Sequence, residues 1–210
     1  MADPAAIQGV ACDLLTALVD SWTVWERVAG DAEQGRQWRQ TSLRMVTACG
    51  AYRSYEEIVA EATREVGLPP GKAKELLQRW GEIEPYPDSS PALEALQRAG
   101  KRLAVVTNCS HRLAELAAGR LPVKWNAIVS AEQAGFYKPH PVPYRVGCAA
   151  LGLPAERTVF VAGSAHDVPG AAGIGMRVYW ANRRNAAPPE GATAWVTRPD
   201  LSALPGLLGG

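Results

Sequence analysis

A chain of 210 residues with 47% hydrophobic residues is long enough to bury a substantial core. Its formal net charge of +1 argues against nucleic acid or an anionic membrane surface as the main partner. No apolar run approaches the roughly 20 residues of a membrane span, and the first residues lack the basic segment of a signal peptide. We therefore expect a cytoplasmic protein without nucleic-acid or membrane partners.

An aspartate follows the first apolar run of the chain. Residues 7–12 have the length and composition of a buried strand, and Asp13 comes directly after them. An α/β protein presents its functional side chains at the carboxyl edge of a parallel sheet, which makes Asp13 a candidate nucleophile. An aspartate at this point can also cap a following helix.

A helical region follows this strand. Between Ser21 and about Trp80, apolar residues recur at helical spacing, and breaks come at Gly30, Gly50 and residues 69–71. A proline-rich return at residues 84–88 leads back to the rest of the chain. We expect an all-helical insertion. Four tryptophans are expected to pack in the protein interior: Trp22, Trp25 and Trp80 in the insertion, and Trp180 in a later strand.

Strands and helices alternate in the remaining chain. The predicted strands cover residues 102–107, 127–130, 158–162 and 177–181, with an edge strand at 195–197. The predicted helices cover residues 91–99, 112–119, 143–151 and 168–173. Such alternation implies a parallel sheet with helices on both faces, so the predicted fold class is α/β.

The cysteines give no sign of a metal site or a disulfide framework. They are scattered without Cys-x-x-Cys spacing, at Cys12, Cys49, Cys109 and Cys148. We expect them to be small buried hydrophobic residues.

Polar side chains follow several of the predicted strands. Thr107 and Asn108 end the strand at 102–107, Lys138 lies in a later loop, and Asp167 follows the strand at 158–162. In a parallel sheet these ends converge on one crevice. A lysine there keeps a nucleophilic carboxylate ionised, and Thr107 and Asn108 can position substrate or donate to developing negative charge. Asp167 can activate water or ligate a metal.

In this order the segments resemble the haloacid dehalogenase superfamily over nearly the whole chain. The family carries an aspartate after its first strand, a hydroxyl residue with Asn after its second, then Lys-Pro, then a glycine- and acid-containing loop. The resemblance implies a Rossmann-like core, formed by residues 1–17 and 88–210, and a helical cap, formed by residues 18–87, that closes over the site.

Two positions bear on the branch of this superfamily. Phosphatases of the family have an aspartate two residues after the nucleophile and an acid after the glycine of the last loop, where this chain has Leu15 and Ser164. A general acid and a magnesium-binding carboxylate are therefore both missing. A magnesium-dependent small-molecule phosphatase remains an alternative.

The sequence is more similar to the L-2-haloacid dehalogenases, which use no metal. Trp38-Arg39-Gln40 resembles their Trp-Arg-Gln segment, and Tyr144 follows Lys138 at their spacing. The resemblance implies a hydrolase that removes halide from a small 2-halo carboxylate through an aspartyl ester, without a cofactor. Its catalytic residues would be Asp13, Lys138 and Asp167. Its substrate-binding residues would be Leu15, Thr16, Arg39, Thr107, Asn108, Tyr144, Ser164 and His166.

Structural interpretations of these side chains stay open. Thr107 and Asn108 can cap the following helix, Arg39 can be a solvated arginine over an aromatic ring, Tyr144 can pack on the sheet, and His166 can lie on the surface.

Departures from the dehalogenase pattern bear on the substrate. The family's Asp-x-Tyr-Gly-Thr is Asp-Leu-Leu-Thr-Ala at residues 13–17, and its Ser-Ser-Asn-Ala-Trp-Asp is Ala-Gly-Ser-Ala-His-Asp at 162–167. These changes spare the nucleophile, the arginine, the lysine and the distal aspartate. They also leave open a non-catalytic member that binds a small acid or a partner protein. The family's habit suggests a homodimer.

Overall fold

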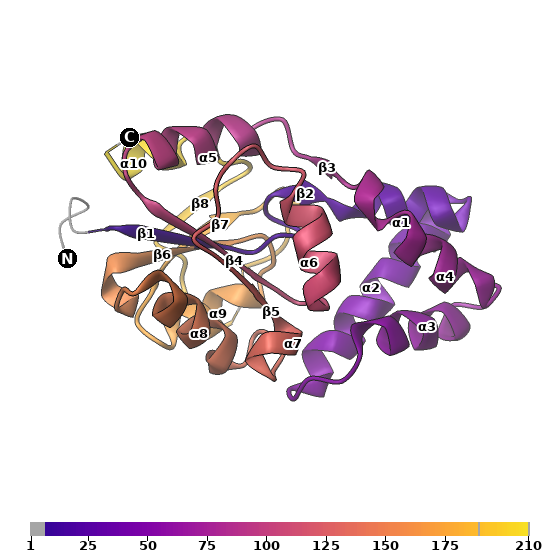
Figure 1. The fold of residues 1–210 in the computed structure, drawn as a ribbon. Coiled ribbons are helices and arrows are strands. Elements are labelled where there is room, and N and C mark those ends of the chain that lie inside the picture. The colour runs from indigo at the N-terminus through magenta and orange to yellow at the C-terminus, as the bar shows by residue number, and fades with distance from the viewer. Residues whose placement is uncertain (1–6, 189, 210) are drawn as a thin grey trace.

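A six-stranded parallel sheet forms the centre of the protein. The computed structural model describes residues 7–188 and 190–209 (Figure 1). In spatial order the strands are β5 (Ala127–Ser130), β4 (Arg102–Thr107), β1 (Gly9–Cys12), β6 (Thr158–Ala162), β7 (Arg177–Ala181) and β8 (Val196–Arg198). All five neighbouring pairs are parallel. The predicted α/β class is confirmed, and each predicted strand is present within two residues of its expected bounds.

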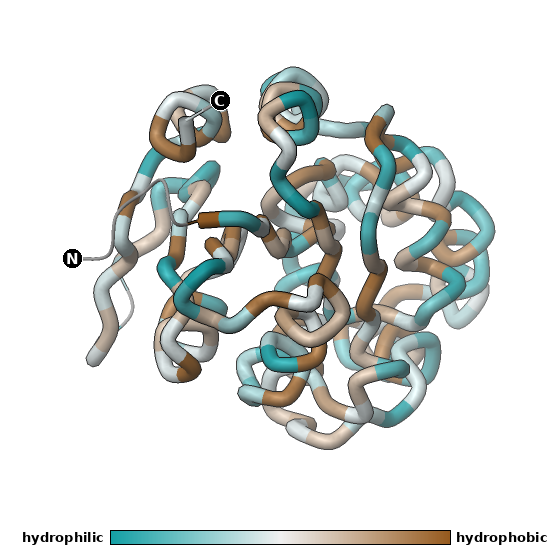
Figure 2. The backbone as a smooth tube through the Cα atoms, turned by 60° about the vertical axis from the view of Figure 1, so that its left-hand side comes forward, coloured by the Kyte–Doolittle hydropathy of each residue, from teal (hydrophilic) through white to brown (hydrophobic). Residues whose placement is uncertain are grey.

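Helices cover both faces of this sheet because alternate strand residues point to opposite sides. Val10 and Val105 belong to a core shared with α5 (Ser89–Arg98), α6 (His111–Ala118) and α10 (Leu204–Leu207). Ala11 and Phe160 belong to a second core, shared with α8 (Pro141–Leu151) and α9 (Asp167–Ala172). Along the outer helices hydrophobic and hydrophilic segments alternate, as expected for helices with one buried face (Figure 2).

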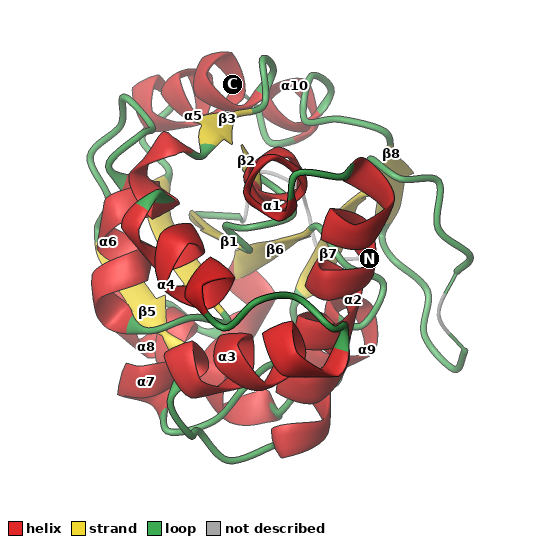
Figure 3. Cartoon of the chain, turned by 90° about the vertical axis from the view of Figure 1, so that its right-hand side faces the viewer, coloured by secondary structure: helices red, strands yellow, loops and turns green. Residues whose placement is uncertain are grey.

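The helical insertion is present as predicted. It comprises α1 (Ser21–Ala29), α2 (Ala32–Cys49), α3 (Tyr55–Glu65) and α4 (Gly71–Gln78), followed by a 3-10 turn at Trp80–Glu82. Seen from their own side, these helices lie in front of the strands (Figure 3). The rings of Trp25 and Trp38 pack edge to face at 4.5 Å between their centres and join α1 to α2.

The insertion is attached to the sheet domain on two sides. On one side, β2 (Val19–Asp20) and β3 (Glu84–Pro85) form an antiparallel ribbon. On the other side, the backbone N–H of Tyr52 donates to Gly135 at 2.9 Å, and that of Tyr137 donates to Gly50 at 2.7 Å. The division into core and cap at residues 17/18 and 87/88 stays a prediction.

Several short elements were not predicted. The strands β2 and β3 have two residues each, α7 (Ala131–Ala134) is a single turn closed by a capping box from Ser130 and Gln133, and a 3-10 turn covers Ala155–Arg157. Elements of this length are too short to produce a periodic pattern.

The free thiols agree with the sequence expectation except for Cys49, which is half-buried where the other three are buried. Among the described residues, no helix is long and apolar enough to cross a membrane.

Gly35 provides a test of the packing between α1 and α2. A Cβ added to Gly35 would lie 2.3 Å from the Cα of Glu26, so the two helices would have to separate. We expect Gly35→Ala to lower the free energy of unfolding by about 1–3 kcal/mol. Gly71→Ala, at the open start of α4 with nothing within 4 Å, should change it by less than about 0.5 kcal/mol. Urea unfolding of both variants measures this, and equal midpoints would contradict the packing described.

Candidate active site

Asp13 lies at the carboxyl end of the central strand β1. Its N–H donates to Val161 at 2.9 Å, which continues the ladder with β6. One carboxylate oxygen, Oδ2, accepts from the Thr16 hydroxyl at 2.6 Å and from the N–H groups of Thr16 and Ala17 at 3.0 and 3.2 Å. The next helix, α1, is capped by Asp20. Asp13 therefore does not cap α1, and its carboxylate accepts hydrogen bonds from the turn that directly follows it.

A buried lysine joins the two carboxylates of the site. Lys138 Nζ lies 2.8 Å from Asp13 Oδ1 and 3.3 Å from Asp167, and its side chain is 2% exposed. Asn108 fixes the backbone of this lysine, because its Oδ1 accepts from the Lys138 N–H at 2.8 Å and its Nδ2 donates to the Lys138 carbonyl at 2.9 Å. Asn108 lines the cavity, but both ends of its amide are used in positioning Lys138.

Tyr144 contacts the carboxylate of Asp167. Its hydroxyl donates to Asp167 Oδ1 at 2.8 Å, and its ring packs edge to face on Phe160. Tyr144 is fully buried and is not part of the cavity wall. The prediction of a substrate contact for Tyr144 is therefore corrected: this side chain orients Asp167.

Thr107 also differs from its prediction. Its side chain is buried, its hydroxyl contacts the Cys109 thiol at 3.8 Å, and it does not line the cavity. Thr107 is the last residue of β4 and packs in the interior, whereas Asn108 follows the strand and lines the cavity. Thr107 is therefore removed from the set of substrate-binding residues.

The shared lysine separates the pKa values of the two aspartates. Burial opposes ionisation of Asp13, but Lys138 and the hydrogen bonds from Thr16 outweigh it and hold the pKa of Asp13 below its usual value. Burial also raises the pKa of Asp167; Lys138 and Tyr144 offset this rise only in part, and the charge on Asp13 adds to it. Burial lowers the pKa of Lys138, but the two carboxylates reverse the effect and keep it protonated. The site thus holds an ionised carboxylate, Asp13, beside a more basic one, Asp167.

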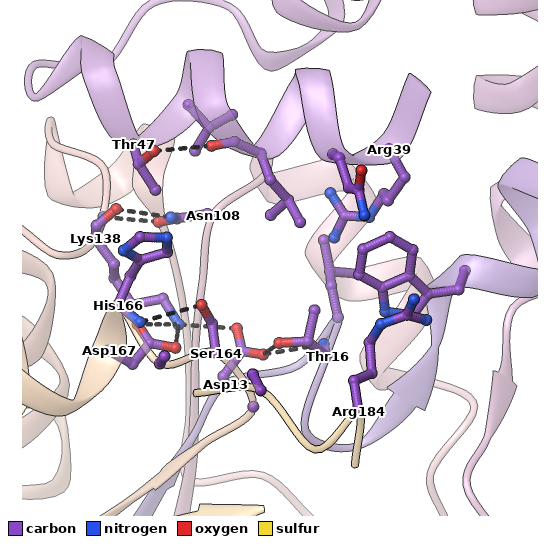
Figure 4. A pocket seen from close by; sticks show the side chains of 18 of the residues that line it. Asp13, Thr16, Arg39, Thr47, Asn108, Lys138, Ser164, His166, Asp167 and Arg184 are labelled. Atoms are coloured by element: carbon purple, nitrogen blue, oxygen red, sulfur yellow. Dashed lines mark hydrogen bonds and ion pairs between the residues drawn. The ribbon is translucent and has the colours of Figure 1, made fainter. Parts of the chain in front are cut away.

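These groups open into a cavity of about 550 Å³ between the sheet and the helical insertion (Figure 4). With Asn108, the cavity wall includes five of the predicted substrate-binding residues from the sheet domain, the others being Leu15, Thr16, Ser164 and His166. The turn after β1 passes so close to Gly163 that a Cβ there would lie 2.3 Å from the Ala17 nitrogen. Position 163, where the sequence departs from the family pattern, therefore has to be a glycine, because a side chain there would overlap the backbone of the turn after β1.

Arg39 reaches the cavity from α2. It is 2% exposed, its Nε has no hydrogen-bond partner among the described residues, and its guanidinium lies 5.3 Å from the centre of the Trp25 ring and 5.7 Å from that of Trp22. The alternative of a solvated surface arginine is therefore wrong. A buried cation without a partner is costly, so this position is suited to an anion.

Several cavity residues were missed by the sequence analysis. Trp22, predicted to serve packing, lines the cavity, as do Tyr55, Tyr86, Arg183 and Arg184. The Arg184 guanidinium lies 4.0 Å from the centre of the Trp22 ring. The position of residues 182–184 directly after the predicted strand at 177–181 was the available signal, because that strand ends at the same sheet edge.

Comparisons with known proteins agree with this architecture. A family model described as haloacid dehalogenase-like hydrolase matches residues 7–175. Haloacetate dehalogenase H-2 of Moraxella sp. (strain B) is 31% identical over 81% of this chain and 82% of its own length. The (S)-2-haloacid dehalogenase H-109 of Pseudomonas putida is 29% identical over 94% and 96% of the two chains.

A solved structure shows the same fold across its full length. A crystal structure described as a dehalogenase with intermediate complex covers 100% of both chains with a TM-score of 0.88 and 26% identity. The resemblance inferred from the sequence motifs is confirmed by these matches. Because the family model extends over most of the chain, the protein belongs to the haloacid dehalogenase-like hydrolases.

Proposed function

We propose that the protein is a metal-independent 2-haloacid dehalogenase that cleaves the carbon–halogen bond of a small 2-halo carboxylate. The observation that carries this proposal is the Asp13–Lys138–Asp167 arrangement on one side of the cavity and, on the other, a buried Arg39 that pairs with no carboxylate of the described residues. Under this proposal Asp13 is the nucleophile and Asp167 the base on one side of the cavity, and Arg39 is the anion-binding cation on the other. The dehalogenase names of the similar proteins support the same reaction.

In the first step, a carboxylate oxygen of Asp13 attacks the carbon that bears the halogen. A carbon–oxygen bond forms, the carbon–halogen bond breaks, and halide leaves with the bonding electron pair. Lys138 keeps Asp13 ionised at neutral pH, and Arg39 receives the carboxylate of the substrate or the departing halide.

In the second step, water attacks the ester carbonyl carbon of Asp13. Asp167, whose pKa is raised mainly by burial, takes a proton from this water. The bond between the Asp13 carbonyl carbon and the ester oxygen breaks, and the departing oxygen takes the proton that Asp167 received from water. A 2-hydroxy acid leaves, and Asp13, which now carries one oxygen from water, loses the remaining proton to solvent and is restored as a carboxylate.

Leu15 separates this reaction from phosphate-ester hydrolysis. Its apolar side chain lies on the cavity wall, where a phosphatase of the family has a general acid. An alkoxide leaving group needs a proton, but a halide departs as a stable anion. A site without that acid is therefore competent for dehalogenation. A magnesium-dependent phosphatase and a non-catalytic acid-binding protein are the outcomes to be tested against this proposal.

Halide release is the direct test. With chloroacetate or (S)-2-chloropropionate and EDTA, we expect turnover by the wild-type protein and a loss of about 10³-fold or more in Asp13→Asn, because an amide cannot act as the nucleophile. Asp31→Asn is the matched control, since Asp31 is an exposed cap of α2 and Asn caps equally well.

Two outcomes would overturn the proposal. Magnesium-dependent release of phosphate from an aryl phosphate, without halide release, would identify a phosphatase. Thermal stabilisation by 2-halo acids, again without halide release, would identify a non-catalytic binding protein.

Isotope labelling tests the ester intermediate. In a single turnover in H₂¹⁸O with enzyme in excess, we expect ¹⁸O in Asp13 and unlabelled product, because water attacks the enzyme's own carbonyl carbon. Mass spectrometry of the peptide that contains Asp13 measures the label. Label in the product and none in Asp13 would show that water attacks the substrate directly.

Tyr144→Phe tests Asp167 as the base. The Tyr144 hydroxyl stabilises the ionised carboxylate, so its removal raises the pKa of Asp167 further, and the acidic limb of the kcat profile should move to higher pH. For the same reason we expect kcat at neutral pH to fall by roughly tenfold. Tyr179→Phe is the control, because this buried hydroxyl donates to the Asp200 carbonyl away from the site. An acidic limb that does not move in Tyr144→Phe would exclude this role.

A further inference from the structure

The cations that line the cavity are not equally neutralised. Lys138 lies between two carboxylates, Arg183 forms a two-pronged ion pair with Asp88 at 2.7 and 2.9 Å, and Arg44 pairs with Glu65. Arg39 and Arg184 differ: within residues 7–188 and 190–209, neither has a carboxylate within 4.0 Å. The cavity therefore holds two guanidinium groups that form no ion pair with a carboxylate of the described residues.

The loop that carries Arg184 is anchored by the neighbouring Arg183. Arg183 is anchored to Asp88, donates from Nε to the Ala17 carbonyl at 2.9 Å, and stacks on Tyr86 at 4.0 Å. This anchoring holds the loop after β7 against the turn that carries the nucleophile. The Arg184 guanidinium then stacks on Trp22, which leaves its N–H edges free to donate.

The two cations approach the cavity from different parts of the fold. Arg39 comes from α2 and Arg184 from the loop after β7, and their side chains converge on the same side of the cavity (Figure 4). Both contact Trp22, with guanidinium-to-ring distances of 5.7 and 4.0 Å. A substrate bound beside Trp22 would therefore meet one cation from the insertion and one from the sheet domain.

A short monocarboxylate uses only part of this site. One carboxylate needs one guanidinium, and a cavity of about 550 Å³ lies in the range that holds considerably larger ligands, roughly 300–1,000 Å³. We propose that the preferred substrates are short 2-halo dicarboxylates, and that Arg184 binds the distal carboxylate through charge-assisted hydrogen bonds. This proposal rests on the proposed function: the same reaction would release halide and leave a 2-hydroxy dicarboxylate.

The test compares two substrates of equal chain length. Halide release is measured with (S)-2-chlorosuccinate, which carries a distal carboxylate, and with (S)-2-chlorobutyrate, which carries a methyl group there. We expect the wild-type protein to prefer chlorosuccinate. In Arg184→Met the ratio of the two kcat/KM values should fall by about 5- to 30-fold, mainly through KM for chlorosuccinate. Because Arg184 is exposed, the wild-type preference should also decrease with added salt.

Arg198→Met is the matched control. Arg198 is an exposed arginine on β8 that does not line the cavity, so its loss changes the net charge equally. We expect the substrate ratio of this variant to equal that of the wild type. An equal fall in both variants would assign the effect to overall charge, and an unchanged ratio in Arg184→Met would overturn the subsite.

Binding of non-halogenated acids separates failure of the subsite from failure of the proposed function. If neither chlorinated acid releases halide, the dehalogenase proposal fails, and calorimetry with succinate and butyrate still tests Arg184. Stronger binding of succinate that is lost in Arg184→Met would support the distal anion subsite. Equal binding of the two acids by the wild-type protein would overturn it.

Discussion

The ammonium group of Lys138 is the constraint on which the site depends. Two carboxylates as deeply buried as Asp13 and Asp167 cannot both remain ionised without a compensating charge, because desolvation and mutual repulsion favour protonation. One lysine within 3.3 Å of both supplies that charge. A buried ion pair is favourable only when its geometry is held. Asn108 holds the backbone of Lys138, and Tyr144 holds the carboxylate of Asp167. Lys138 and Asp13 are separated by 125 residues, so the whole sheet domain is needed to bring them together.

The chemistry and the recognition of substrate come from different parts of the chain. In the proposed function, the sheet domain provides the nucleophile Asp13, the lysine and the base Asp167, whereas the insertion provides Arg39 and the aromatic wall around it. The buried sheet edge is rigid and suits groups that must keep their distances to a few tenths of an ångström. The helical insertion contacts the sheet domain through the β2–β3 ribbon and through the hydrogen bonds at Gly50 and Tyr52, and none of the catalytic groups named above lies on its helices.

Much of this arrangement was predictable from the sequence, for identifiable reasons. Buried parallel strands are short apolar runs, and their carboxyl ends share one edge, so Asp13, Lys138 and Asp167 could be placed together before any coordinates. The contacts of Thr107 and Tyr144 could not be predicted, because the sequence pattern places Thr107 at the end of a strand and Tyr144 on a helix without showing which neighbours their hydroxyl groups meet. The ribbon of β2 and β3 is too short for a pattern, and Arg184 is unremarkable in sequence until its neighbour's ion pair with Asp88 fixes the loop.

The insertion is attached to the sheet domain at two places, and the second attachment lies next to Lys138. A lid with a single hinge is free at the end opposite that hinge. Here Gly50 and Tyr52, at the end of the insertion away from the β2–β3 ribbon, are hydrogen-bonded to Tyr137 and Gly135 in the segment that leads directly to Lys138. Lifting that end would break backbone bonds next to the lysine that keeps the nucleophile ionised. A displacement of the insertion at this point would thus act first on Tyr137, the residue directly before Lys138, and the two hydrogen bonds from Asn108 are what separate Lys138 from that displacement.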